Sequence, residues 1–444
     1  MLRRGIQHPA RLIPLTFLGT ILLGTVLLML PVARAGDGSA PFLTAIFTST
    51  SAVCVTGLAV VDTPVYWSMF GQVVILGLCH IGGFGIMTGA TLLGMLVMRR
   101  LRLGTRLIAQ AETRSLGLGD VTAVLKLILL VTFSVEALVA AALTLRLHYG
   151  YGESWGLALW NGVFQSISAF NNAGFSTYSD SLMGFVTDPL IVVPIMLAII
   201  IGGLGFPVLF ELKREPGQWS RWSIHTKITL LGSGILIVGG ALAILLYEYG
   251  NPATLGPLDT SGKLLGALFH SVTARTAGFN TLDVGSMGTE TLAVNYVLMF
   301  IGGGSAGTAG GIKVTTFFLL GFVVWTEVRG SQDTTAFRRR ISAETQRLAL
   351  TVVLLGVGAL AVATLLMLSV TDLPLEVVMF ETISAFATVG LSTGITAGLP
   401  PMGQWILIAL MFVGRVGTIT VATALALRSK APAYRYPEER PIVG

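Results

Sequence analysis

The sequence contains little charge. Only 11% of its 444 residues are Asp, Glu, Lys or Arg, whereas 53% are hydrophobic and the mean hydropathy is +0.80. Such a composition excludes an ordinary soluble domain and indicates a membrane protein with several spans. The polar stretches between the hydrophobic runs are short, so we expect no soluble domain between them.

Cysteine is also scarce. Cys54 and Cys79 are the two cysteines of the chain, both lie in hydrophobic surroundings, and neither has partners at metal-ligand spacing. A disulfide or a metal cluster is therefore not expected. The five histidines are scattered, and we recognise neither a paired carboxylate site nor an activated nucleophile. The sequence thus predicts that the chain is not an enzyme and binds no cofactor.

Long hydrophobic runs occur in pairs along the chain. Each run is long enough to cross a hydrocarbon core of about 30 Å. A half-length apolar helix is expected between the two runs of each pair, at 42–52, 160–169, 264–273 and 376–385. The pairs are 12–30 with 73–98, 127–145 with 190–210, 228–247 with 296–325, and 348–368 with 405–427. We therefore predict an all-α polytopic membrane protein with eight full spans.

A short polar segment ending in glycine follows each half-length helix. Counted with the bulky apolar residue that follows each glycine, the four segments are 51–58, 168–175, 273–279 and 384–391. Irregular backbone at membrane depth is tolerated only where it is buried in protein or lines water, and glycine reaches backbone angles closed to other residues. Glycines that permit close helix packing would explain one such segment. Four in register favour four span–pore loop–span repeats around one central pore, with backbone carbonyls that replace the hydration shell of a cation.

The distribution of charge predicts the topology. Most of the 28 basic residues lie in five stretches, at 3–11, 99–126, 213–227, 329–347 and 428–440. Because cytoplasmic loops collect Lys and Arg, both termini and the loops between repeats are expected in the cytoplasm. The outer loops carry acidic residues: Asp37, Asp62, Glu153, Asp180, Asp188, Glu248, Asp259, Asp283, Glu290, Asp372 and Glu376. They could form an acidic vestibule that concentrates cations or be incidental, and the sequence leaves both open.

Three basic residues fall inside the repeats: Arg275, Lys313 and Arg415. Intramembrane cations are costly and mark functional positions. The run 302–313 contains six glycines within ten residues, and each glycine costs a helix about 1 kcal/mol relative to alanine. We therefore expect the second run of the third pair to break into two halves, joined by a loop beneath the glycine segments that can obstruct ion passage.

These motifs carry a resemblance to a known family. With Val55-Thr56-Gly57-Leu58, the runs 168–176 and 384–391, and Arg275-Thr276-Ala277-Gly278-Phe279-Asn280, the chain resembles the membrane subunits of the Ktr/Trk/HKT potassium transporter superfamily. The resemblance covers essentially the whole chain, and eight spans fit the Ktr branch best. It implies potassium uptake across the bacterial cell membrane through a channel-like pore, with potassium as the transported ion and sodium as a candidate activator.

The resemblance also implies a selectivity filter. Family filters with glycine in all four repeats are associated with potassium preference. The filter residues would be Val55, Thr56, Gly57, Asn172, Ala173, Gly174, Thr276, Ala277, Gly278, Thr388, Val389 and Gly390, supported by Cys54, Asn171, Arg275 and Ala387. Arg275 could bond carbonyls behind the filter as a strut or repel ions at the axis. We favour the strut, because a cation on the axis would oppose conduction.

The family places a gate in the glycine-rich loop. The gate residues would be Gly302, Gly303, Gly304, Ser305, Ala306, Gly307, Thr308, Ala309, Gly310, Gly311, Lys313 and Arg415. Hydrogen bonds from Arg415 to loop carbonyls would hold the loop closed; the alternative is a buried pair, for example with Glu136. Lys313 could face the loop or extend to the cytoplasmic surface.

The repeats define the expected organisation and partners. They comprise residues 1–100, 101–215, 216–330 and 331–430, followed by a cytoplasmic tail at 431–444. The resemblance implies a homodimer docked on a cytoplasmic ring of nucleotide-binding subunits, with no nucleic acid partner. Arg338-Arg339-Arg340 and the tail residues 434–440 are candidates for that contact, although the triple arginine could equally bind anionic lipid. The alternative functions are an alternating-access secondary transporter and a less selective potassium/sodium pore.

Overall fold

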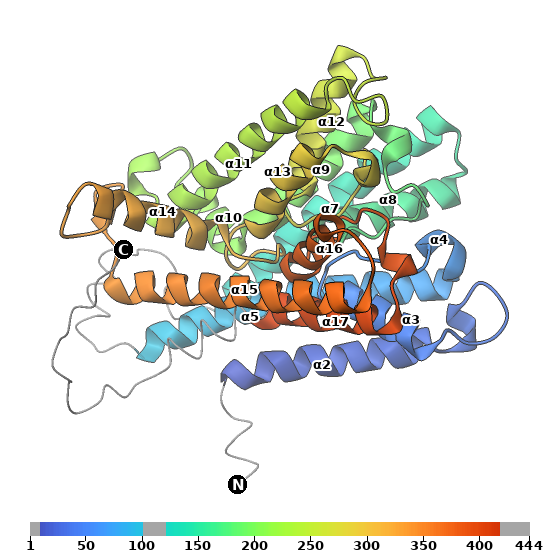
Figure 1. The fold of residues 1–444 in the computed structure, drawn as a ribbon, viewed down its shortest axis with the longest axis horizontal. Coiled ribbons are helices and arrows are strands. Elements are labelled where there is room, and N and C mark those ends of the chain that lie inside the picture. The colour runs from blue at the N-terminus through green and yellow to red at the C-terminus, as the bar shows by residue number, and fades with distance from the viewer. Residues whose placement is uncertain (1–8, 101–120, 418–444) are drawn as a thin grey trace, which may run out of the picture.

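The computed structural model describes residues 9–100 and 121–417, and the fold is mostly helical (Figure 1). The predicted contacts of the tail 431–444, and the end of the predicted run 405–427, lie outside these residues. Helices fall into four groups, each with a first helix, a short helix, an irregular segment and a second helix. Group 1 contains α2 (Pro9–Leu28), α3 (Phe42–Val53), α4 (Thr63–Tyr66) and α5 (Met69–Arg100).

The other three groups repeat this order. Group 2 contains α7 (Val121–Tyr151), α8 (Trp155–Phe170), α9 (Pro189–Leu204) and α10 (Phe206–Arg214). Group 3 contains α11 (Ile224–Glu248), α12 (Thr260–Thr273), α13 (Thr289–Phe300) and α14 (Val314–Val328). Group 4 contains α15 (Ala343–Val370), α16 (Leu375–Ala387), α17 (Pro401–Phe412) and a π-helical turn at Val413–Gly417. A two-stranded hairpin, β1 (Thr335–Ala336) with β2 (Arg339–Arg340), precedes group 4.

Local sequence sets several of the helix starts. Ser154, Ser223, Asp259 and Ser342 each precede a helix and accept a hydrogen bond from the backbone amide three residues later. These side chains satisfy amides that have no partner within the helix. Two of the predicted half-length helices, α8 and α12, consequently begin four or five residues earlier than the hydrophobic pattern indicates.

Two second helices are broken. The third group breaks as its glycine content predicts, because α13 ends at Phe300 and α14 begins at Val314. The run predicted to span at 190–210 is bent, which the sequence did not indicate: α9 ends at Leu204 and α10 continues at an angle of 96°. Gly205 makes the bend with a φ of +89°, a conformation open to glycine but strained for other residues.

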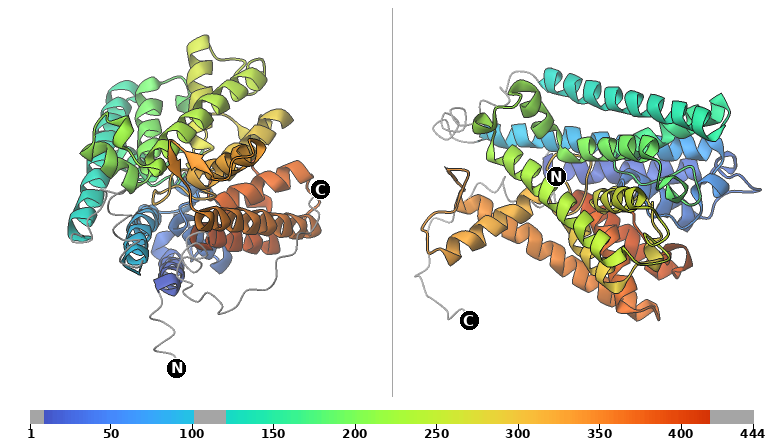
Figure 2. Two further views of the ribbon diagram at one scale, coloured as in Figure 1. Left: turned by 90° about the vertical axis from the view of Figure 1, so that its left-hand side faces the viewer. Right: turned by 90° about the horizontal axis from the view of Figure 1, so that it is seen from above.

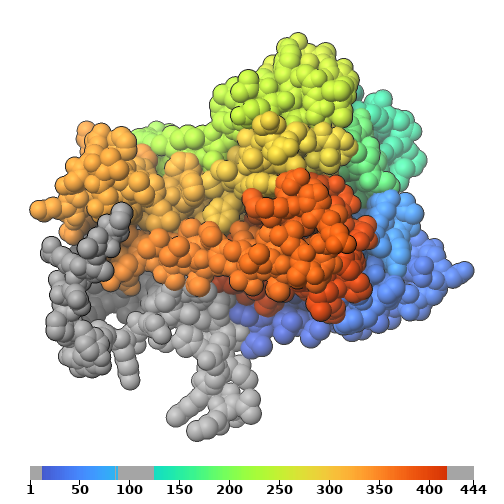
Figure 3. Space-filling model, in the orientation of Figure 1, coloured from blue at the N-terminus to red at the C-terminus, as the bar shows by residue number. Residues whose placement is uncertain are grey.

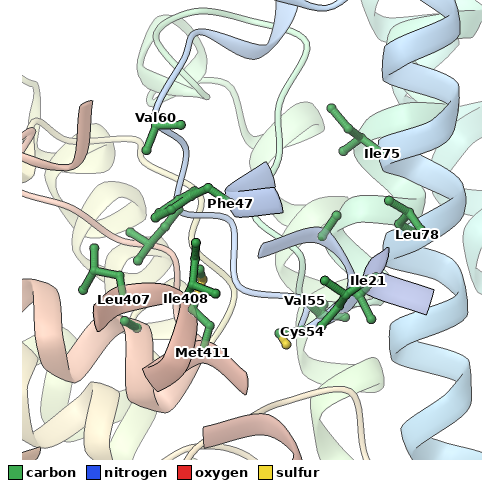
Figure 4. Packing of buried hydrophobic residues seen from close by; sticks show 14 of the residues in the cluster. Ile21, Phe47, Cys54, Val55, Val60, Ile75, Leu78, Leu407, Ile408 and Met411 are labelled. Carbon is green, nitrogen blue, oxygen red and sulfur yellow. The ribbon is translucent and has the colours of Figure 1, made fainter. Parts of the chain in front are cut away.

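The four groups pack in chain order around the molecule. The second helix of each group contacts the short helix of the next, in the pairs α5–α8, α9–α12, α13–α16 and α17–α3. In the end-on view of Figure 2, the chain colours accordingly follow one another around the molecule. Figure 4 shows the last of these contacts, where Ile408 and Met411 of α17 lie beside Phe47 and Cys54 of the first group. The fourth group therefore contacts the first, and the four groups form a closed circle.

Apolar side chains cover the outside. α15 crosses the face shown in Figure 3, and its Leu354 and Leu365 are 61% and 68% exposed. Among the described residues, three helices are long and apolar enough to cross a membrane: Leu125–Tyr151, Ile224–Glu248 and Ala343–Val370. The bent pair α9 and α10 would make a fourth. Exposed apolar helices of this length fit a multi-pass membrane protein, while the count of eight full spans stays a prediction.

Candidate functional site

The four glycine segments share one backbone conformation. The residue two positions before each glycine has a positive φ: +55° at Val55, +57° at Asn172, +75° at Thr276 and +49° at Thr388. Each glycine is also positive, from +70° at Gly174 to +96° at Gly57, whereas the residue between them is not. A β-branched residue in this region is a genuine outlier, and such strain persists only where the surroundings impose it.

Hydroxyl residues at the ends of the short helices hold this conformation. The backbone carbonyl of each accepts the amide of the middle residue of the segment, as in Ser51 with Thr56 at 2.8 Å. Their side chains make a second hydrogen bond to the segment. The hydroxyl of Ser51 accepts from the amide of Gly57, and the hydroxyl of Ser168 donates to the carbonyl of Phe175. The recurrence of these hydroxyl residues is visible in the sequence, but it predicted no role for them: Ser51, Ser168, Thr273 and Ser384.

The four glycines lie against one another in a closed ring. A Cβ built on Gly57 would lie 2.6 Å from the carbonyl oxygen of Ala173. The same relation joins Gly174 to Ala277 at 2.8 Å and Gly278 to Val389 at 2.5 Å. A Cβ on Gly390 would collide with the carbonyl of Thr56, which returns to the first segment. Glycine is therefore required at all four positions by close backbone approach as well as by φ.

Other glycines seat the short helices. In groups 1, 2 and 4, a Cβ on the second helix would collide with the carbonyl of the last or penultimate residue of the short helix, in the pairs Gly82–Val53, Gly202–Phe170 and Gly414–Phe386. These contacts are close helix packing of the kind that small residues permit in membranes. Packing and the ring are thus two separate uses of glycine in this fold.

A cavity of about 530 Å³ opens on one side of the ring and is lined by all four ring glycines. Among the described residues that line it, Asp62 is the one that is charged. The other carboxylates that could have formed an acidic vestibule do not line it, and several have local partners: Glu153 accepts from Tyr178 and Asp188 from Arg146. The structure therefore favours the incidental interpretation for most of the acidic outer residues.

The loop 301–313 lies at the opposite end of the segments. The hydroxyl of Thr308 donates to the carbonyl of Phe170, at the end of α8, at 3.2 Å. A Cβ on Gly310 would lie 2.6 Å from the carbonyl of Ala387, at the end of α16. The loop therefore covers those ends of the segments that lie opposite the cavity. This is the position that the sequence predicted for it.

The bend between α9 and α10 forms a seat for this loop. The amide of Gly304 donates to the carbonyl of Gly203 at 2.8 Å, and that of Thr308 donates to Gly202 at 3.0 Å. Across the bend, the amide of Phe206 donates to the carbonyl of Ala306. The sequence did not indicate this seat, because the glycine pattern of group 2 resembles that of the unbroken helix α5.

Arg415 and Lys313 both bond the loop. Arg415 is 2% exposed, and its Nη1 donates to the carbonyl of Thr308 at 2.5 Å. Lys313 Nζ donates to the carbonyls of Ala309 and Gly310 rather than extending away from the loop. The alternative pairing of Arg415 with Glu136 is wrong: Glu136 instead accepts from Asn171. Both cations therefore stabilise the arrangement of the loop seen here.

Arg275 lies behind the third segment. Its Nη2 donates to the carbonyl of Gly302 at 3.0 Å and to Ser233 Oγ at 3.1 Å. The side chain is 7% exposed, and it bonds α11 and the loop. These contacts are those expected of a strut, because the several donors of a guanidinium can bond carbonyls from more than one element.

Gly205→Ala should displace the loop. The new Cβ would collide with the carbonyl of Ser305, and the φ of +89° is strained for alanine. We expect a single cysteine introduced as Ser305→Cys, in a background without Cys54 and Cys79, to react faster with a water-soluble maleimide when alanine replaces Gly205. Gly234→Ala, where a Cβ meets nothing within 4 Å, is the matched control. Equal labelling in all backgrounds would argue against the seat.

Comparison with known proteins identifies the family to which this chain belongs. The sequence model of the TrkH family, described as cation transport protein, matches residues 16–434. The Ktr system potassium uptake protein B of Bacillus subtilis (strain 168) is 40% identical over 443 residues, which cover 98% of this chain and 97% of that protein. The chain belongs to the TrkH family of cation transport proteins.

Further TrkH-family relatives agree. A Ktr system potassium uptake protein B from Vibrio alginolyticus is 39% identical over 98% of this chain and 94% of its own length. The potassium/sodium uptake protein NtpJ of Enterococcus hirae is 34% identical, with coverage of 98% and 97%. The crystal structure of the potassium transporter TrkH from Vibrio parahaemolyticus superposes with a TM-score of 0.70 at 18% identity, over 93% of this chain and 84% of that one. That likeness shows that the TrkH-family fold is shared.

Proposed function

We propose that this chain is a potassium uptake protein that conducts through a pore at the centre of the glycine ring. The observation that carries the proposal is the closed contact of the four glycine segments in chain order. The four segments are thus four walls around one central axis, along which an ion could pass. The names of the full-length relatives, which describe potassium uptake, support potassium as the cargo.

Carbonyl oxygens of the segments would bind the dehydrated ion. In extended backbone, successive carbonyls point in opposite directions, whereas residues that alternate in the sign of φ turn them to the same side. Each segment has this alternation over the three residues that end at its glycine, as in Val55–Gly57. A ring of carbonyl dipoles can replace the hydration shell of potassium. The filter would consist of Val55–Gly57 and its three counterparts, with Cys54, Asn171, Arg275 and Ala387 behind it.

The loop 301–313 would act as the gate. It lies across the segment ends opposite the cavity, and it is bonded by Arg415, by Lys313 and by the bend at Gly205. Arg415 belongs to the π-helical turn Val413–Gly417, and such turns are frequent at functional sites. Breaking these few bonds would let the loop move without unfolding any helix.

The proposal extends to the membrane and to partners. The four repeats would comprise eight spans of a bacterial cell membrane protein, with both termini and the basic loops in the cytoplasm. Because Ktr system proteins are named as parts of a system, we propose a homodimer controlled by a cytoplasmic nucleotide-binding subunit. The β1–β2 hairpin with Arg338–Arg340 would belong to that contact surface.

Alternating-access transport is the competing function. Broken helices at membrane depth, such as α13–α14, also occur in secondary transporters. Such proteins typically bind their substrate between two large repeats with an ionisable residue at the site. Here the ring consists of four small segments, and its own twelve residues contain no carboxylate. The geometry therefore favours the pore.

Ion flux through the purified protein tests the function. We expect proteoliposomes that contain the chain to take up potassium and rubidium down a gradient, with sodium at least tenfold slower, on the order of 1.4 kcal/mol of selectivity. Empty liposomes give the leak. Single-channel recording in a planar bilayer then separates the mechanisms, because a turnover of a few ions per second would favour alternating access. Equal sodium and potassium flux would favour the less selective pore.

A further inference from the structure

Glu136 is a buried carboxylate close to the second filter segment. It lies in α7 and is 5% exposed. Its Oε1 accepts a hydrogen bond from Asn171 Nδ2 at 3.1 Å and lies 3.4 Å from His80 Nδ1. His80 belongs to α5 of group 1, whereas Glu136 and Asn171 belong to group 2. The carboxylate thus connects two neighbouring walls of the ring.

Asn171 is the residue through which Glu136 would act on the filter. It caps the C-terminus of α8 and directly precedes Asn172, whose φ is +57°. Its Nδ2 also donates to the carbonyl of Ile167 at 2.9 Å. On the other side, a Cβ on Gly83 of α5 would collide with Asn171 Oδ1, so the missing side chain at Gly83 makes room for the amide. The Asn171 side chain is therefore bonded to α7 and α8 and lies close against α5.

The other three walls show what is particular to Asn171. The equivalent residues, each just before the left-handed position, are Cys54, Arg275 and Ala387. Arg275 bonds a neighbouring helix and the loop, while cysteine and alanine offer no comparable donor. Two of the four segments thus have a polar side chain that bonds residues behind the ring. Of these two, Asn171 is the one whose partner is a carboxylate.

We propose that Glu136 is a positioning residue for ion selectivity. By accepting the Asn171 amide, it fixes the turn at Asn172 and thereby the carbonyl of Ala173, which lies against Gly57 of the first wall. A buried amide that loses its acceptor relaxes toward another partner, and the carbonyl ring then loses its spacing. The inference rests on the proposed filter and adds to it a residue that lies outside the pore.

The test is a set of substitutions at the two positions, with potassium and sodium uptake measured in proteoliposomes at equal protein. Glu136→Leu removes the acceptor and should lower the potassium-to-sodium flux ratio about tenfold, the scale of one charge-assisted hydrogen bond. Glu136→Gln keeps an oxygen that can accept and should stay within about twofold of the parent. Glu344→Leu, at an exposed carboxylate in the first turn of α15, is the control.

A double substitution guards against a trivial folding defect. Asn171→Asp places two carboxylates at a 3.1 Å contact. Their repulsion should lower the flux ratio below that of Glu136→Leu. In the double variant Asn171→Asp with Glu136→Gln, the glutamine amide can donate to the aspartate carboxylate, so the hydrogen bond returns with donor and acceptor exchanged. We expect this variant to recover part of the potassium-to-sodium flux ratio. If the double variant is no better than Asn171→Asp, or if Glu136→Leu keeps the parental ratio, the positioning role is overturned. If the parent itself shows no potassium preference, the proposed filter fails instead.

Discussion

Arg415→Met should raise potassium flux through the isolated protein about thirtyfold, which corresponds to the loss of about 2 kcal/mol for a charged hydrogen bond. Arg415 donates to the carbonyl of Thr308 from a fully buried position. The substitution keeps an unbranched apolar chain of similar length but removes the donor and the positive charge. Both changes favour a displaced loop, because the loop arrangement seen here loses its bond from Arg415 to Thr308.

Rubidium influx into proteoliposomes, measured over seconds, gives the rate. Arg329→Met is the matched control, since Arg329 is exposed at the end of α14 and stacks on Trp325. The potassium-to-sodium ratio should stay at the parental value in both variants, because the ring itself is unchanged. A rate for Arg415→Met at or below the parental rate would remove Arg415 from the gate.

Gly278→Ser should abolish most of the preference for potassium over sodium. The new Cβ would lie 2.5 Å from the carbonyl oxygen of Val389 and 3.1 Å from the Cα of Gly390, both backbone atoms of the next wall. Its φ of +77° adds a strain of about 1–2 kcal/mol for a residue with a side chain. The walls must therefore move apart, and we expect the selectivity ratio to fall about tenfold or more, equivalent to at least ~1.4 kcal/mol.

The comparison of potassium, rubidium and sodium fluxes measures this effect. Gly358→Ser is the control, because Gly358 is exposed on α15 and a Cβ there meets nothing within 4 Å. The control should be as selective as the parent, and both variants should elute as the parent does in size-exclusion chromatography. Unchanged selectivity in a well-folded Gly278→Ser protein would contradict the assignment of the third wall.

The four sequence repeats allowed the overall architecture of this protein to be predicted. Hydrophobic length predicted helical runs, and the glycines recurring at the same place in each repeat predicted four equivalent segments, because glycine readily adopts irregular backbone angles. The glycine-rich run 302–313 predicted the break between α13 and α14 for the same reason. These features depend on residues near one another in the chain, so local sequence determined them.

The pairing of distant residues was decided only by the tertiary structure. Arg415 and Glu136 are both charges in apolar runs, and nothing in the sequence distinguished a mutual pair from bonds to Thr308 and Asn171. The bend at Gly205 was equally hidden, since Gly202–Gly205 repeats the spacing of Gly82–Gly85 within the unbroken helix α5. What differs is the loop 301–313, whose amides find acceptors at the bend. A backbone donor has no sequence signature, so where it bonds depends on the whole fold.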